Sequence, residues 1–259
     1  MAVPGGEDTV SGRLREGDLW RMALRASLLQ ATWNFERQQG IGWAWALEPA
    51  LDRLYPDPAV RCERLAEHTA YFNTQPTLAS LALGAVAALE ERRAAGDGPD
   101  GEAIARVKSV LGSSLAAMGD RLFWFTLRPV AACLGIWAAL AGHPIAALVM
   151  WIAYNIPHLG LRVLGVRWGY QLGPAVLSGA LRRQLESLTR LLNALGAALI
   201  GVLLAWIIAP GGEPHLLVFE ATLGAGLGLG FLAALRPRPS PTEWALGLGA
   251  LCLIAVWFR

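Results

Sequence analysis

Hydrophobic and polar positions alternate in helical patterns through the first half of the chain. Residues 17–31 carry apolar side chains on one broad side and arginines on another, which predicts an amphipathic helix, either on a membrane surface or partner or in an ordinary core. Residues 58–71 mix charged and apolar positions and predict a solvated helix. The apolar run 78–89 is shorter than the ~20 residues that span a hydrocarbon core, so it predicts a re-entrant segment or a buried helix. Residues 94–101 are rich in Gly and Asp and predict an exposed loop.

A long apolar stretch from Pro129 to Pro157 opens the second half. It contains no Asp, Glu, Lys or Arg, and Gly142-His143-Pro144 interrupts it. Two interpretations are open, a single long kinked span or a hairpin of two short half-helices. Arg128 precedes the stretch and Arg162 and Arg167 follow it, and because basic flanks stay cytoplasmic, the hairpin is favoured. Non-helical backbone at membrane depth survives only where protein buries it or where it lines a cavity, so a break here would indicate a transport path.

The remainder of the chain predicts a basic loop and three closing membrane spans. Residues 160–190 contain five arginines and predict a cytoplasmic loop. Uncharged or nearly uncharged runs at about 191–209, 216–235 and 242–258 predict transmembrane helices.

The pattern as a whole predicts an all-α integral membrane protein in three parts. Residues 1–16 are Gly-rich and polar and predict a disordered tail. Residues 17–128 form a polar or amphipathic helical region with re-entrant-type hairpins, and residues 129–258 form the membrane domain.

Composition and charge agree with this division and exclude several functions. Hydrophobic residues make up 54% of the 259 positions and charged residues 16%, whereas soluble domains contain about 25% charged residues. Of the 20 acidic residues, those beyond position 128 are Glu186, Glu213, Glu220 and Glu243. The net charge of +2 and the lack of a basic stripe interleaved with aromatics argue against nucleic-acid binding. No nucleophile–base pair, metal-ligand cluster or phosphate-binding Gly loop is visible, so we expect no catalytic residue, metal or cofactor.

Four strings of residues occur in an order that resembles a known family. They are Leu29–Arg37 (LQATWNFER), Phe72–Pro76 (FNTQP), the interrupted string Gly119–Pro129 (GD, LFW and TLRP) and Arg167–Gly173 (RWGYQLG). Together they are similar to the IID component of the mannose/fructose/sorbose branch of the bacterial phosphotransferase system (PTS). The resemblance extends over residues 20–258.

The resemblance implies a function that depends on partner proteins. In this family IID pairs with a IIC membrane protein, and together they import a mannose-type hexose across the bacterial inner (plasma) membrane. Soluble IIA and IIB proteins, or a fused IIAB, pass phosphate from phosphoenolpyruvate through histidines to the sugar. IIC–IID pairs assemble into a higher oligomer. IID carries no phosphorylated residue, so the chain is expected to be a non-catalytic, multi-pass subunit.

The first candidate site residues are Trp33, Asn34 and Glu36, in the densest of the four strings. The Glu36 carboxylate could accept hydrogen bonds from sugar hydroxyl groups, and Trp33 offers an apolar ring face. The alternative is structural, an ion pair between Glu36 and Arg37 or a helix cap.

Three further candidates lie in the second and third strings. Asn73 and Thr74 would contact substrate or IIC from the tip of a membrane-inserted hairpin, or else cap a turn or helix before Pro76. Asp120 precedes a strongly apolar stretch, where a carboxylate is costly unless it is paired. It would either shape the sugar path or tie the fold together through Arg121 or Arg128.

The chain departs from the family pattern around Asp120. Family members commonly have Gly-Pro where this chain has Ser113-Ser114, Gly where it has Ala117 and Phe125, and a small residue or Pro where it has Arg121. Because lost glycines limit close backbone approach, two functions are open. The chain is a working permease subunit, or it is a non-transporting IID-like interaction or regulatory subunit that binds IIC.

Overall fold

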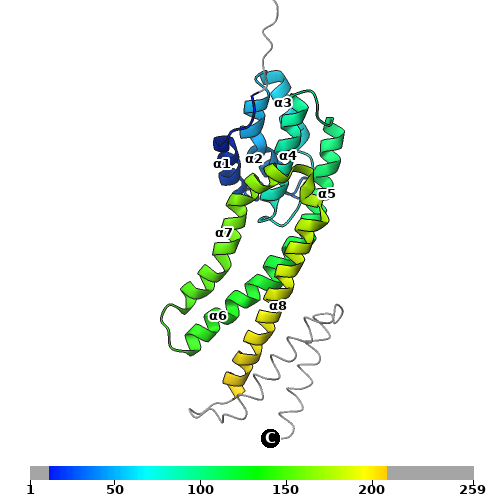
Figure 1. Cartoon of the computed structure of the whole chain (residues 1–259). Coiled ribbons are helices and arrows are strands. Elements are labelled where there is room, and N and C mark those ends of the chain that lie inside the picture. Colours follow the sequence, from blue (N-terminus) through cyan, green and yellow to red (C-terminus); the bar gives the residue numbers. More distant parts are fainter. Residues whose placement is uncertain (1–11, 209–259) are drawn as a thin grey trace, which may run out of the picture. The chain divides into compact units, whose positions relative to one another are not determined.

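The computed structural model describes residues 12–208, which form helices, two isolated β-bridges and no strand. The helices are shown in Figure 1. In chain order they are α1 (Glu16–Ala26), α2 (Gly40–Leu54), α3 (Pro58–His68), α4 (Ala79–Ala94), α5 (Gly101–Gly119), the π-helix η1 (Asp120–Leu127), α6 (Arg128–Leu140), α7 (Ala146–Leu172), the 3-10 helix η2 (Gly173–Leu177) and α8 (Gly179–Ile208). The predicted all-α class is confirmed for these residues. Most of the predicted tail and the predicted spans 216–235 and 242–258 lie outside the described residues.

The chain divides into two compact units. The first unit comprises the residues up to 125 together with residues 151–186, and the second comprises residues 126–150 and those from 187 onward. Three helical elements, η1, α7 and α8, therefore contribute residues to both units.

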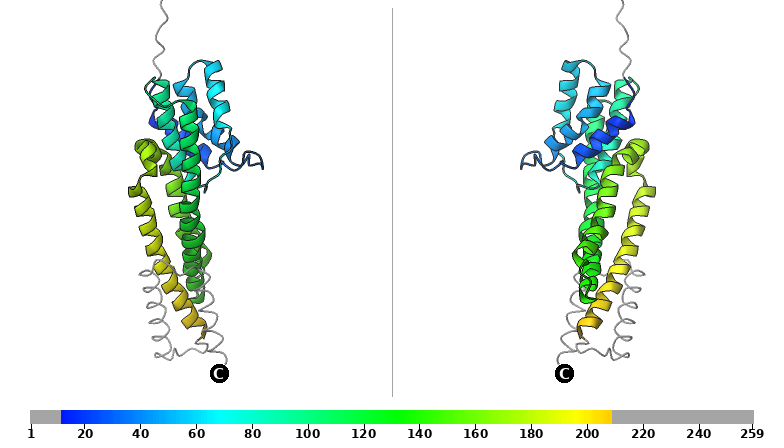
Figure 2. Two further views of the ribbon diagram at one scale, coloured as in Figure 1. Left: turned by 90° about the vertical axis from the view of Figure 1, so that its right-hand side faces the viewer. Right: turned by 90° about the vertical axis from the view of Figure 1, so that its left-hand side faces the viewer.

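Helices α1 to α5 cluster around a common core in the first unit, as the two side views in Figure 2 also show. Its largest fully buried side chains include Met22, Trp43, Leu47, Leu51, Phe72, Leu83, Ile104 and Leu111. Every residue from Ala79 to Ala87 of α4 is buried, so the run 78–89 forms a buried helix in this unit. The re-entrant hairpins stay a prediction.

Helix α7 packs against α4 through glycines that allow the two backbones to touch. A Cβ atom added at Gly84 of α4 would lie 1.9 Å from the Val166 carbonyl oxygen, and one at Gly169 of α7 would lie 2.0 Å from the Leu81 carbonyl oxygen. No side chain fits at either position, because real Cβ contacts do not fall below 3.0 Å. Gly169 is the first of two glycines in the string 167–173, and its presence is explained as a packing requirement.

A tight turn separates α6 from α7, so residues 129–157 do not form one continuous helix, and α7 is longer than the short half-helix that the hairpin interpretation expects. How this stretch lies in a membrane stays a prediction. Gly142 has a φ of +77°, a value that favours glycine. Its N–H donates to the Ala139 carbonyl at 2.9 Å, and the His143 N–H donates to the Ala138 carbonyl at 3.0 Å. These bonds satisfy two of the last carbonyl groups of α6 and end that helix.

The predicted loop over 160–190 is wrong, because these residues are helical. Helix α7 continues through Pro157 to Leu172, and η2 and the start of α8 follow it. Pro157 removes one backbone hydrogen bond but leaves the helix intact. Two of the five arginines contact α1: Arg162 donates to the Ala26 carbonyl at 3.0 Å, and Arg167 lies 3.5 Å from Glu16.

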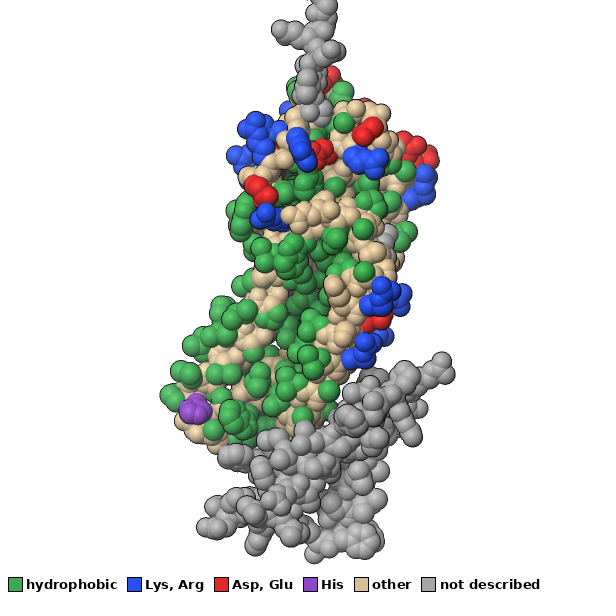
Figure 3. Space-filling model, viewed as in Figure 1, with side chains coloured by type: hydrophobic (Ala, Val, Ile, Leu, Met, Phe, Trp, Pro, Cys, Tyr) green, Lys and Arg blue, Asp and Glu red, His purple; other side chains and the backbone are tan. Residues whose placement is uncertain are grey.

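Two helical stretches among the described residues are long and apolar enough to cross a membrane, Gly101–Leu140 and Ala146–Val176. The first contains η1, which ends just before Pro129. Proline has no backbone N–H, so the Phe125 carbonyl lacks an i→i−4 partner, and a widened turn results. Figure 3 shows hydrophobic side chains covering α7, while charged side chains gather over α1 to α4. The predicted span 191–209 lies almost wholly within α8.

Candidate functional site

Two loops of the first unit, residues 27–39 between α1 and α2 and residues 69–78 between α3 and α4, lie side by side. The Gln39 N–H donates to the Phe72 carbonyl at 2.8 Å, and the Phe72 N–H donates to the Arg37 carbonyl at 3.3 Å. The predicted first helix, 17–31, ends earlier than expected, at Ala26, because the 27–39 loop folds as a series of turns. The two loops carry five of the six predicted site residues.

A buried amide joins the loops. The Gln39 side chain is 1% exposed, its Nε2 donates to the Thr74 carbonyl at 2.8 Å, and its Oε1 accepts from the Thr74 N–H at 3.0 Å. Each such buried bond contributes about 1 kcal/mol, and leaving either group without a partner costs more. Thr74 is consequently enclosed in the unit, and its hydroxyl has no hydrogen-bond partner among the described residues.

The predicted residues of the 27–39 loop are largely exposed. Asn34 Oδ1 accepts from the N–H groups of Glu36 at 3.1 Å and Arg37 at 2.8 Å, so Asn34 stabilises a turn. Trp33 is 42% exposed and packs edge-to-face on Phe35, with ring centroids 5.0 Å apart. The Glu36 side chain is 84% exposed and lies 3.9 Å from the Arg37 guanidinium, so the expected ion pair forms at the surface, where such pairs contribute little.

The 69–78 loop also reaches the third predicted segment. Asn73 is exposed on this loop. A Cβ atom at Gly119 would lie 2.6 Å from the Cβ of Gln75, so the end of α5 packs directly on the loop. Asp120 follows as the first residue of η1 and is half-buried. The three predicted groups of residues therefore belong to one unit, with the 69–78 loop touching the other two segments.

The sequence did not single out Gln75, Thr77 and His158, which form a hydrogen-bonded chain from this loop to α7. Gln75 Oε1 accepts from the backbone N–H groups of Thr77 at 2.7 Å and Leu78 at 3.0 Å, so Gln75 caps the start of α4. Gln75 Nε2 lies 3.2 Å from Thr77 Oγ1, which lies 2.7 Å from His158 Nδ1. The available signal was a histidine inside an apolar helix, since ionisable residues at membrane depth are functional candidates by default.

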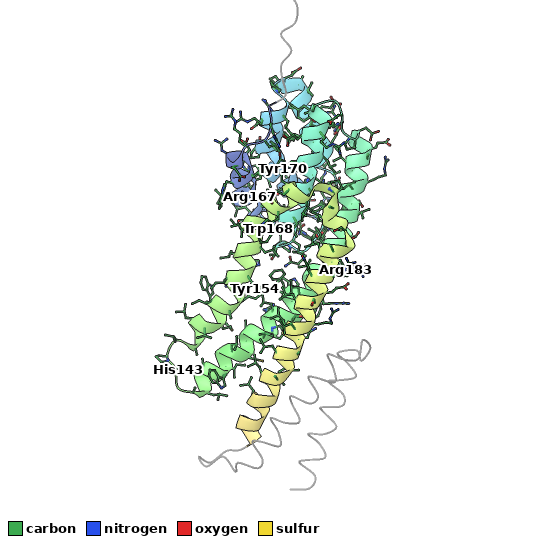
Figure 4. All side chains as sticks on the ribbon, viewed as in Figure 1. His143, Tyr154, Arg167, Trp168, Tyr170 and Arg183 are labelled. Atoms are coloured by element: carbon green, nitrogen blue, oxygen red, sulfur yellow. The ribbon has the colours of Figure 1, made fainter. Side chains whose placement is uncertain are left out.

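Aromatic rings surround this histidine. The Tyr154 ring stacks on the His158 ring with centroids 5.5 Å apart, and Phe123 meets it edge-on at 5.9 Å. Figure 4 shows Tyr154 on the first half of α7 and Arg167, Trp168 and Tyr170 on its second half.

A buried lysine supports the start of the 69–78 loop. Lys108 of α5 donates to the carbonyls of His68 at 2.8 Å and Ala70 at 3.4 Å, at the C-terminal end of α3. Its ammonium group also lies 5.3 Å from the Trp43 ring centroid and 5.6 Å from that of Phe72. The helix dipole and the ring faces both favour a cation there.

A buried carboxylate anchors α4 to the neighbouring helices. Glu90 is 0% exposed, accepts from the Tyr55 hydroxyl at 2.6 Å, and lies 3.1 Å from His68 Nε2 and 3.4 Å from Arg93. Burial raises the pKa of the Glu90 carboxyl, but His68, the Tyr55 hydrogen bond and the Arg93 charge outweigh it, so the pKa lies below its ordinary value. Burial raises the pKa of Glu67 as well, and the Arg93 guanidinium, which binds it at 2.7 Å, brings that pKa down below its ordinary value.

The chemistry of this region is hydrogen bonding beside aromatic rings. Among residues 12–208, no group of three or more His, Cys, Asp or Glu side chains is placed to hold a metal ion. Amide, hydroxyl and imidazole groups next to ring faces are the means by which proteins recognise neutral polar ligands.

Two helical stretches among the described residues have the length and composition of membrane spans, which are features of a helical membrane protein. Residues 13–210 match the family described as "PTS system mannose/fructose/sorbose family IID component", and the chain belongs to this family. It is a membrane component of a mannose-family PTS permease.

Curated relatives and solved structures agree with this assignment. The chain is 37% identical over 198 residues to the PTS system mannose-specific EIID component of Escherichia coli (strain K12), covering 76% of this chain and 70% of the relative. It is 35% identical over 193 residues to the fructose permease IID component of Bacillus subtilis (strain 168), covering 74% and 70%. A chain of the structure titled "CryoEM Structure of Mannose Transporter ManYZ and Microcin E492 (MceA) complex" matches with a TM-score of 0.60, 31% identity, and coverage of 95% of this chain and 97% of that chain. A chain titled "Structure of membrane protein" matches at 0.65, with 29% identity and coverage of 94% and 97%.

Proposed function

We propose that this chain is the IID subunit that forms, with a IIC protein, the complex that imports a hexose coupled to its phosphorylation by IIA and IIB. The observation that carries the proposal is a hydrogen-bonded cluster at the 69–78 loop in a member of a permease family. We call this cluster the polar centre; it consists of Gln39, Thr74, Gln75, Thr77 and His158. Burying an amide is costly unless its polar atoms are hydrogen-bonded. Here Gln39 and Gln75 hold this loop in one conformation.

The exposed groups beside this centre suit contact with a sugar or with IIC. Glu36 and Asn73 present acceptor and amide groups, and Trp33 presents a ring. Apolar side chains of α7, among them Trp151, Ile156 and Leu159, are exposed and suit lipid or a partner helix. We infer a multi-pass position in the bacterial inner membrane, with IIC–IID pairs joined in a higher oligomer.

The test is phosphoenolpyruvate-dependent uptake of labelled mannose in cells that express the cognate IIA, IIB and IIC proteins, with and without this chain. Uptake that requires the chain supports the proposal. A stable complex with IIC that imports no member of a hexose panel would favour the non-transporting alternative. In that event Arg121 and Phe125, both on η1, would be the departures to revert first.

We expect Glu36→Gln and Asn73→Ala each to reduce uptake about tenfold at equal protein levels, because a lost charge-assisted or amide hydrogen bond to a substrate costs on the order of 1.5 kcal/mol. Both side chains are exposed, so the fold should be unaffected. Glu102→Gln, on the 85% exposed carboxylate of α5, is the matched control and should leave uptake unchanged. Unchanged uptake in Glu36→Gln and Asn73→Ala would remove these residues from the site.

A further inference from the structure

The orientation of the Gln75 amide is fixed by the backbone. Its Oε1 lies 2.7 Å from the Thr77 nitrogen and 3.0 Å from the Leu78 nitrogen, and both nitrogens carry hydrogens that can only donate. The atom facing them must therefore be the carbonyl oxygen, and the other end of the amide is the NH₂ group. That NH₂ group donates to Thr77 Oγ1 at 3.2 Å.

The direction of the next hydrogen bond follows from the burial of Thr77. Thr77 is 0% exposed, its Oγ1 accepts from Gln75, and among the described residues the acceptor found for its own hydrogen is His158 Nδ1, 2.7 Å away. A hydroxyl oxygen can accept twice, but the reverse direction would leave this buried hydrogen without an acceptor. Nδ1 is then the acceptor nitrogen of a neutral imidazole, and the ring hydrogen is on Nε2. The chain Gln75–Thr77–His158 thus sets the tautomer of the histidine.

The Nε2–H group is a donor for which the described residues supply no acceptor. His158 is half-buried on α7, within the stretch Ala146–Val176. Among residues 12–208, no hydrogen bond from its Nε2 is found. Tyr154 and Phe123 hold the ring from one face and one edge, so its orientation is fixed by packing as well. A fixed donor in an apolar helix is costly unless an acceptor reaches it.

We propose that His158 Nε2–H donates to an oxygen of the transported sugar, and that Gln75 and Thr77 are the positioning residues that keep this hydrogen on Nε2. This inference rests on the proposed transport function and names a contact of that site. A protonated Nε2 cannot bind a metal, and a neutral ring matches a neutral hydroxyl or ring oxygen. The Tyr154 and Phe123 rings supply the apolar surroundings in which such a bond discriminates strongly.

Two substitutions at His158 separate the donor from the packing. His158→Phe keeps an aromatic ring between Tyr154 and Phe123 but has no donor. His158→Gln can accept from the Thr77 hydroxyl with its carbonyl and donate with its amide. In the uptake assay with labelled mannose, or with whichever hexose the wild type imports best, we expect His158→Phe to raise KM about tenfold with Vmax per complex retained. His158→Gln should stay within about threefold of the wild type.

The positioning role is tested at Thr77, which does not touch the sugar in this scheme. Thr77→Val keeps the side-chain shape but leaves both tautomers of His158 accessible, so KM should rise about threefold to fivefold. Thr77→Ser restores the hydroxyl and should restore KM. A purely structural role would instead change the amount of IIC–IID complex in the membrane and would not be rescued in KM by Thr77→Ser.

The proposal is overturned if His158→Phe has a wild-type KM, or if His158→Gln is as impaired in KM as His158→Phe. These results would leave the proposed transport function standing, because wild-type uptake is the reference. If the wild type imports no hexose and the purified IIC–IID complex binds no labelled mannose, the proposed function and this contact both fail.

Discussion

Gly169→Ala is expected to destabilise the protein by about 3 kcal/mol, at the upper end of the usual cost of overpacking. The added Cβ would lie 2.0 Å from the Leu81 carbonyl oxygen, which is backbone inside α4 and cannot rotate away as a side chain could. Helices α4 and α7 would have to separate, and the buried apolar contacts around the crossing would be lost. Thermal unfolding of the purified complex with IIC should show a fall in Tm of about 10 °C.

Gly160→Ala is the matched control on the same helix. Gly160 has nothing within 4 Å of its Cβ position, and alanine is the better helix former by about 1 kcal/mol. Gly160→Ala should therefore leave Tm unchanged or raise it slightly. A backbone contact at Gly169 predicts that Gly169→Ala lowers Tm and that Gly160→Ala does not. Equal losses of Tm in both variants would contradict the close contact between α4 and α7 at Gly169.

Gly84 of α4 tests whether the two glycines, Gly84 and Gly169, belong to one and the same contact between α4 and α7. Gly84→Ala should cost as much as Gly169→Ala, since its Cβ would lie 1.9 Å from the Val166 carbonyl oxygen. Once one substitution has separated the helices, the other has little left to disturb. The double variant should consequently lose much less Tm than the sum of the two single losses.

Helices α1, α3 and α4 were predicted from local patterns of apolar and polar residues, whereas α2 and α5 were not singled out. The break between α6 and α7 depends on Gly142 and its neighbours, and a positive φ at a glycine two residues before a proline can be anticipated from the sequence. For the apolar run 78–89 the sequence left two alternatives open, a re-entrant segment and a buried helix, because a run of that length is compatible with both. The structure has the buried helix α4.

The polar centre could not be predicted in the same way. Gln39 and Thr74 are 35 residues apart in sequence, and Thr77 and His158 are 81 apart, so no periodicity connects them. Of the predicted residues, Asn34 forms a turn and Thr74 is enclosed, whereas Trp33 and Glu36 are accessible. Residues that hold a site in place are recognised only when their distant partners are known.

The predicted 160–190 loop failed because arginines were interpreted as markers of irregular chain. Positive charge indicates which parts of a membrane protein avoid the hydrocarbon core, but it does not end a helix. Arg162 and Arg167 are spaced so that both can contact α1 from one helix. Charge alone therefore did not predict the secondary structure of these residues, and their expected cytoplasmic location stays a prediction.

Glu90→Ala is expected to cost about 3–5 kcal/mol, as breaking a buried ionic contact does when one partner is removed. The carboxylate is 0% exposed, and its loss would leave the Tyr55 hydroxyl and His68 Nε2 without that acceptor. Glu102→Ala removes an 85% exposed carboxylate from an i,i+4 pair with Arg106 and should cost less than about 0.5 kcal/mol. Both variants remove a glutamate carboxylate, and they differ in how buried that carboxylate is and in its partners. Tm values of the two variants in the purified complex with IIC therefore compare the buried contact with the exposed one.

The same substitution should change how stability depends on pH. The pKa values of Glu90 and Glu67 lie below their ordinary range in the folded protein, so both carboxylates contribute stability above the unfolded pKa of about 4.3, and this is lost as pH falls through the folded pKa. The wild-type Tm should thus fall steeply below about pH 4.3, and the Glu90→Ala Tm should start lower and fall less. Parallel Tm curves for the two proteins from pH 7.5 down to pH 3.5 would mean that Glu90 titrates normally. The network of His68, Tyr55 and Arg93 would then not be what holds α4 in place.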